Sequence, residues 1–188
     1  MEDARSFADP AGLLTGDELL RLPHLNPCEL VNGRIVRMTP TNADHGRIEV
    51  NVAVALKAFV RTQNLGSVMA GEVGIFTRRN PDTVRAADVL FLSHEREALR
   101  TRRQGFLDVA PDLIVEVLSP EDRPGEMQQK LSEYVAIGVR LVWVADPATR
   151  TVRAYRGLDE VRSLNVGDVL VGEEVLPGFT MPVAAVFE

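Results

Sequence analysis

The segment that most constrains the fold spans residues 112–145, where two apolar runs flank a stretch with helical spacing. The runs DLIVEVL and VRLVWVA are typical of buried strands, and EMQQKLSEYVAI between them is typical of a helix. Gly138 follows this helix directly, and glycine commonly ends helices at this position. The segment therefore predicts a strand–helix–strand unit, and a chain built around it belongs to the α/β or α+β class.

The remaining segments predict further strands and helices. Asn32-Gly33 lies between two alternating apolar segments, which is a strong signal for an N-terminal β-hairpin. Apolar residues at helical spacing predict a long helix from about residue 45 to residue 63. Other strands are expected around residues 67–72, 74–78, 84–93, 139–147 and 151–156.

Size, charge and cysteine content narrow the class of protein. The 188 residues suit one domain over residues 1–188, with residues 1–14 as a flexible arm. A formal net charge of −6 argues against broad coating of nucleic acid, but a nuclease site is itself acidic. The single cysteine, Cys28, excludes an internal disulfide. No apolar run could span a bilayer and the N-terminus is unlike a secretory signal, so we expect a cytoplasmic protein.

Two acidic residues lie within mainly apolar strands. Asp88 lies within VRAADVLFL, and Glu116 lies within LIVEVL. Burying a carboxylate is costly, so such a group must be ion-paired, hydrogen-bonded or bound to a metal. Together, the two acids predict a hard-oxygen site for Mg²⁺ or Mn²⁺. Taken singly, each is equally well explained as a strand-end acid that faces solvent or an arginine.

One lysine on the predicted helix is the third candidate. Of the 21 lysine and arginine residues only Lys57 and Lys130 are lysines, because arginine fills the other basic positions. A lysine in such a chain can serve a purpose that arginine cannot, such as presenting a compact ammonium group. Lys130 and Tyr134 are four residues apart and share a helical face, which the strand–helix connection brings back over Glu116. A lysine there could orient or deprotonate an attacking water, or stabilise the charge growing on a phosphate, with Tyr134 as a helper or packing residue. The alternative is a surface lysine paired with Glu126.

These features together resemble a known family. Over roughly residues 15–185 the chain resembles the Uma-two family, whose members are described as endonucleases, through ELVNGRIVRMTP, AADVLFLS, PDLIVEVLSP, the lysine-bearing helix and GVRLVWVADP. That family belongs to the PD-(D/E)XK superfamily, with a restriction-endonuclease-like core in which helices flank a mixed central sheet. The resemblance implies that Asp88 and Glu116 bind the metal ion, with the Val117 carbonyl as a further ligand. It also implies that Lys130 is the catalytic lysine.

The chain departs from the superfamily signature at one functional position and has two further candidates. The signature places the lysine two residues after the second acid, where this chain has Leu118, so Lys130 must act from the helix instead. Glu29, at the hairpin, could bind a second metal ion or relay protons; a solvent-facing acid is the alternative. His45, near the start of the long helix, could bind a phosphate or a metal-bound water; the alternative is a capping or hydrogen-bonding histidine.

The main hypothesis is a Mg²⁺- or Mn²⁺-dependent endonuclease that hydrolyses phosphodiester bonds in DNA. Cutting both strands with one active site per chain favours a symmetric homodimer. The alternative is a catalytically inactive protein of nuclease fold that serves as a nucleic-acid-binding or assembly module. A third and weaker reading is a pair of carboxylates that acts on another substrate, such as a glycoside.

Overall fold

A mixed sheet forms the centre of the molecule, which the computed structural model describes over residues 12–188. In this part of the chain the sheet has eight strands, ordered β2-β1-β4-β5-β6-β7-β8, with β3 also paired to β4. Strands β5 and β6 are parallel, and a separate small sheet joins β9 to β10. The strands are β1 (Cys28–Val31), β2 (Arg34–Arg37), β3 (Gly66–Arg78), β4 (Thr83–Ser93), β5 (Leu113–Val117), β6 (Leu141–Asp146), β7 (Thr151–Arg156), β8 (Glu160–Leu164), β9 (Val169–Val171) and β10 (Thr180–Pro182).

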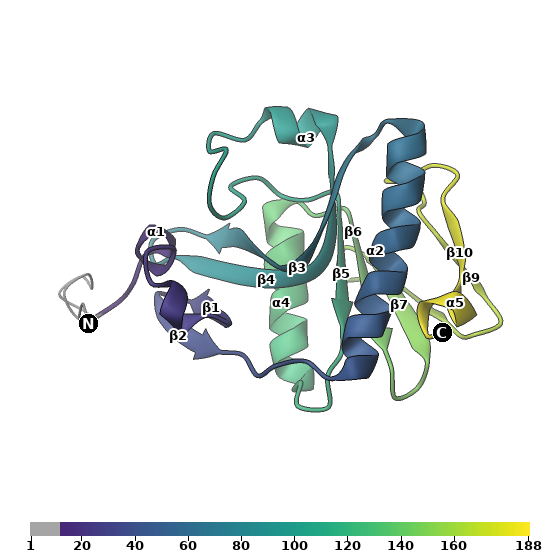
Figure 1. Cartoon of the computed structure of the whole chain (residues 1–188), viewed down its shortest axis with the longest axis horizontal. Helices are drawn as coiled ribbons and strands as arrows, with labels where there is room; N and C mark the ends of the chain where they lie inside the picture. Colours follow the sequence, from purple (N-terminus) through teal and green to yellow (C-terminus); the bar gives the residue numbers. More distant parts are fainter. Residues whose placement is uncertain (1–11) are drawn as a thin grey trace.

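Two long helices cover opposite faces of the sheet (Figure 1). Successive strand residues point to opposite faces, so Trp143 packs in the core beneath α2 while its neighbour Val144 packs in the core beneath α4. Both faces of the central strands are therefore buried, which confirms the predicted mixed architecture. The helices are α1 (Gly16–Leu19), the 3-10 turn η2 (Pro23–Leu25), α2 (Ala43–Gln63), α3 (His94–Ala98), α4 (Pro124–Ile137) and α5 (Val183–Val186).

Local sequence signals explain where the two long helices begin and end. The side chain of Asn42 accepts a hydrogen bond from the first turn of α2, and Asn64 closes the helix in the left-handed conformation with φ 51°. Gly138 closes α4 in the same way with φ 95°. Residues Asn32 and Gly33, with φ 51° and 75°, form the predicted hairpin turn between β1 and β2.

One strand replaces two that the sequence predicts. Residues 67–72 and 74–78 are expected as separate strands, but both belong to β3, which pairs with β4 from Gly66 to Arg78. The pairing register shifts between Ala70 and Val73, where Gly71 and Glu72 have positive φ. A bulge of this kind absorbs extra residues and bends the strand without ending its pairing. The glycine therefore marks a bend rather than a turn.

Two different strands, β1 and β5, pair with the same edge of β4 and leave part of that edge unpaired. Strand β3 follows one edge of β4 along its whole length, so β1 and β5 share the other edge. Strand β1 pairs with β4 at Val84, and β5 pairs with β4 only from Val89 to Phe91. Between these pairings, residues 85–88 face a gap between β1 and β5. Side chains instead of a neighbouring strand must satisfy the backbone in this gap.

The N-terminal arm predicted for residues 1–14 lies mostly outside the described residues. At its described end, Leu14 is buried and its backbone N–H donates to the Gly33 carbonyl at 2.8 Å. No helix within residues 12–188 is long and apolar enough to cross a membrane.

Candidate functional site

Asp88 lies in the gap between β1 and β5, and its carboxylate reaches β5. Its Oδ2 accepts a hydrogen bond from the Val117 backbone N–H at 2.7 Å, and the carboxylate side chain is only 8% exposed. The same oxygen is 3.3 Å from Nε2 of His45, which comes from the first turn of α2. Asp88 therefore connects β4, β5 and α2 at one point, and it does not face solvent as the simpler interpretation allowed.

Glu116 points to the opposite side of β5 from the α2 core and meets α4. Its Oε2 is 2.8 Å from Nζ of Lys130, and its Oε1 accepts a hydrogen bond of 2.7 Å from the hydroxyl of Tyr134. Burial raises the pKa of Glu116 to about 7, although the charge of Lys130 opposes this shift. The four-residue spacing of Lys130 and Tyr134 thus brings both side chains to one carboxylate, as the helical periodicity predicts.

Lys130 is surrounded by oxygen atoms from three elements. Its Nζ donates to the Ala86 carbonyl at 3.1 Å and lies 3.3 Å from Oε1 of Glu29, in addition to its contact with Glu116. The pairing with Glu126, which the sequence left open, is not the one formed. Burial alone would lower the pKa of Lys130, but Glu116 and Glu29 raise it above its usual 10.5. The amine is therefore a stable cation rather than a base.

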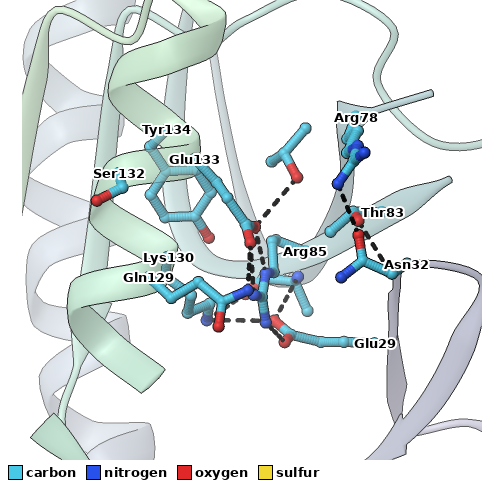
Figure 2. A network of polar contacts seen from close by, with 12 residues as sticks. Glu29, Asn32, Arg78, Thr83, Arg85, Gln129, Lys130, Ser132, Glu133 and Tyr134 are labelled. Carbon is cyan, nitrogen blue, oxygen red and sulfur yellow. Dashed lines mark hydrogen bonds and ion pairs between the residues drawn. The ribbon is translucent and has the colours of Figure 1, made fainter. Parts of the chain in front are cut away.

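A second cation, Arg85, joins this group from β4. Its guanidinium binds both oxygens of Glu133 at 2.6 and 2.8 Å and Oε2 of Glu29 at 2.8 Å. Figure 2 shows Lys130 and Glu133 from α4 converging on Arg85 and Glu29. Sequence reasoning missed Arg85 and Glu133. A signal existed, because Arg85 interrupts the same apolar strand as Asp88.

Glu29 is held between the two cations. Its Oε1 also accepts a hydrogen bond from the Ala86 backbone N–H at 3.0 Å. Burial would raise the pKa of Glu29, but Lys130, Arg85 and the Ala86 hydrogen bond lower it below 4.5. Glu29 is therefore a buried, paired carboxylate and not a solvent-facing strand acid.

His45 is buried beside Asp88, and only one of its two ring nitrogens contacts that carboxylate. The side chain of Asn42 caps the helix by accepting from the His45 backbone N–H, so the imidazole itself does not cap the helix. Burial would lower the pKa of His45, but the hydrogen bond and charge of Asp88 outweigh it and raise the pKa above 6.5. Among residues 12–188 the buried Nδ1 of His45 finds no hydrogen-bond partner.

The donor set is compatible with a divalent cation that keeps water and substrate ligands. In the described part of the chain, no group of three or more histidine, cysteine, aspartate or glutamate side chains is arranged so that it could hold a metal ion. Mg²⁺ typically uses one or two carboxylates, and water or phosphate oxygens supply the rest. The cluster has four carboxylates (Glu29, Asp88, Glu116 and Glu133) and two cations (Arg85 and Lys130), of which Glu133 and Lys130 are partly buried and the others buried.

The fold and a family match relate this chain to proteins that are described as nucleases. A mixed sheet with helices on both faces is a restriction-endonuclease-like architecture. The chain matches the family described as "Putative restriction endonuclease" (Uma2) over residues 17–184, and it therefore belongs to that family.

A solved structure supports the fold independently. It is described as "a putative nuclease belonging to DUF820 from Anabaena variabilis ATCC 29413" and superimposes with a TM-score of 0.77 at 20% sequence identity. The similarity covers 93% of this chain and 97% of the other. No curated protein sequence matches the chain.

Proposed function

We propose that this protein is a Mg²⁺- or Mn²⁺-dependent endonuclease that hydrolyses phosphodiester bonds in DNA. One observation carries the proposal: the ammonium group of Lys130 is 2.8 Å from Glu116, beside Asp88, in a gap of the central sheet. Two carboxylates and a cation in a buried, water-poor setting suit phosphoryl chemistry, which depends on positioning and charge stabilisation. The family description, restriction endonuclease, supports DNA as the substrate.

Asp88 and Glu116 would hold the divalent cation, with the Val117 carbonyl as a further ligand. When bound, a divalent cation polarises the scissile phosphate and stabilises the charge that grows on it. The Val117 N–H fixes the Asp88 carboxylate, and the Tyr134 hydroxyl fixes that of Glu116. Both acids are therefore oriented before any ligand arrives.

Lys130 would neutralise negative charge on the attacked phosphate. Its raised pKa keeps the amine protonated at neutral pH, which suits charge stabilisation and not proton abstraction. His45 is the better candidate to take up a proton, because its Nδ1 is unpaired among the described residues and its Nε2 faces Asp88. One such site per chain would cut both strands of a duplex as a symmetric homodimer.

Nicking of supercoiled plasmid in Mn²⁺ tests the proposal. The wild type should nick DNA in the presence of Mn²⁺, and the nicking should stop when a chelator is added. Asp88→Asn, Glu116→Gln and Lys130→Met should each lower nicking by about a hundredfold or more, as expected when transition-state charge stabilisation is lost. Lys57→Met removes the other lysine, which is exposed on α2, and should cut like the wild type. Equal nicking by all variants would contradict the proposed site.

A binding function without catalysis is the second candidate, favoured by the engagement of both oxygens of Glu116 with Lys130 and Tyr134. A cation would have to displace or share these contacts. A binding module would retain DNA in the presence of chelator and leave plasmid intact in Mn²⁺. Nicking that depends on Mn²⁺ and on Glu116 excludes this alternative.

A further inference from the structure

We propose that Arg85 is a positioning residue: through Glu29 it holds the Lys130 ammonium group in place at Glu116. The inference rests on the proposed nuclease function and assigns Arg85 no contact with substrate. The proposed role of Arg85 is to fix the position of the Lys130 ammonium group, the cation that the proposed function requires.

All three guanidinium nitrogens of Arg85 make hydrogen bonds, and the residue is almost completely buried. Its Nε and Nη2 bind the two oxygens of Glu133, and its Nη1 binds Oε2 of Glu29. Only 6% of the residue is exposed. A planar guanidinium can bridge two carboxylates at fixed angles, whereas a lysine ammonium cannot reproduce this fork.

The two oxygens of Glu29 divide between the two cations. Oε2 is bound by Arg85, while Oε1 faces Lys130 at 3.3 Å and accepts from the Ala86 N–H. Without Arg85 the carboxylate would keep only one anchored oxygen and could rotate. The contact between Lys130 and Glu29 would then no longer be fixed.

Glu133 couples this arrangement to the helix that carries Lys130. Both residues lie on α4, three positions apart, so the Arg85–Glu133 pair fixes the helical face that presents the lysine. Glu133 is itself held by Thr77 of β3 and Gln129 of α4. Arg85 therefore links β1, β3, β4 and α4 around one ammonium group.

Burying charged groups costs free energy, because they lose their contacts with water. Apolar residues of similar volume often stabilise a fold as well or better than a buried ion pair. A chain of charges that ends at Lys130 is explained if it fixes the geometry of that lysine, which an apolar contact could not orient.

The protection of Lys130 from a small amine-reactive reagent tests this proposal without substrate or metal. The chain has only two lysines, so exposed Lys57 is an internal reference for reagent and time. In the wild type, Lys130 should react much more slowly than Lys57, measured on the two peptides by mass spectrometry. Arg85→Gln should raise the Lys130/Lys57 rate ratio about tenfold, the factor expected when a charge-assisted hydrogen bond is lost.

Arg96→Gln is the matched control. Arg96 is also a hydrogen-bonded arginine that contacts the end of α4, through the Gly138 carbonyl, and it pairs with Asp112 away from the site. It should lower the melting temperature and leave the rate ratio unchanged. If the Lys130/Lys57 rate ratio rose in both variants in proportion to their loss of melting temperature, the proposal would be overturned. Such a result would show that lower stability alone exposes Lys130.

Two further measurements make the outcome decisive. If Arg85→Gln does not fold, Glu133→Gln takes its place, since it keeps Arg85 and weakens its anchor; an unchanged ratio in that variant would overturn the proposal. In the nicking assay, Arg85→Gln should lower kcat with little change in KM, because Arg85 does not touch the substrate. Failure of the wild type to nick DNA would refute the proposed function, whereas an unchanged rate ratio in a folded Arg85→Gln would refute the role of Arg85.

Discussion

Nζ of Lys130 on α4 lies 2.8 Å from Oε2 of Glu116 on β5. Helix α4 packs over β5, so that the ammonium group on the helix contacts the carboxylate on the strand. The signature position for this lysine, two residues after Glu116, is Leu118. The structure thus brings a lysine to the second acid by a different route through the chain.

Lys130→Met should destabilise the fold and abolish nicking together. Glu116 and Glu29 would remain buried without their shared cation, and breaking a buried ion pair typically costs about 3 kcal/mol or more. Urea unfolding measures the first effect and plasmid nicking the second. Lys57→Met should change neither, and equal effects from the two lysine variants would contradict the assignment.

Tyr134→Phe should retain the packing of α4 and remove only the hydroxyl that donates to Glu116. The tyrosine is fully buried, so the unfolding free energy should fall by about 1.5 kcal/mol, typical of a hydrogen bond to a charged group. Nicking should drop by about tenfold as the carboxylate becomes less well oriented. Unaltered stability and rate would show that the Tyr134–Glu116 hydrogen bond has no role.

Glu29→Gln should have a pH-dependent effect on stability. Lys130 and Arg85 lower the pKa of Glu29 in the folded protein, so its charge stabilises the fold above the unfolded-state pKa near 4.5. This contribution is lost as the pH falls through the lower, folded-state pKa. The variant should therefore be less stable than the wild type by about 3 kcal/mol at neutral pH, with the difference shrinking below the unfolded-state pKa. Urea unfolding at several pH values measures it, and a difference that grows on acidification would contradict the ion pairing.

Asp88→Asn should weaken Mn²⁺ binding while leaving the fold nearly unchanged. The amide oxygen can still accept the hydrogen bond from the Val117 N–H, but the negative charge is gone. Electron paramagnetic resonance of free Mn²⁺ should give at least a tenfold higher Kd for the variant, consistent with the loss of one anionic ligand. Asp44→Asn serves as the control. Asp44 is an exposed acid in the first turn of α2, and this variant should bind Mn²⁺ like the wild type.

Local signals in the sequence predict much of the fold. The Asn32-Gly33 turn, the close of α4 at Gly138 and the strands around Asp88 and Glu116 all follow from short-range rules. The convergence of Lys130 and Tyr134 follows from their spacing once a helix returns over β5. The continuity of β3 does not follow, because a glycine within a strand pattern is compatible with either a bulge or a turn.

The charge network could not be predicted, because it depends on pairings between distant strands. The gap between β1 and β5 along β4 exists only once three strands have taken their registers. Arg85 then points at Glu133, and Asp88 meets His45, across separations that no periodicity encodes. Sequence rules locate the acids in their strands, while sheet topology decides which charges pair.

Anomalous diffraction from crystals soaked in Mn²⁺ tests the central claim most directly. We expect one strong peak within coordination distance, about 2.2 Å, of carboxylate oxygens from both Asp88 and Glu116. Lys130 should remain close enough to reach a phosphate bound to the same ion. Bound Mn²⁺ elsewhere on the protein, with both of these carboxylates free of metal, would contradict it.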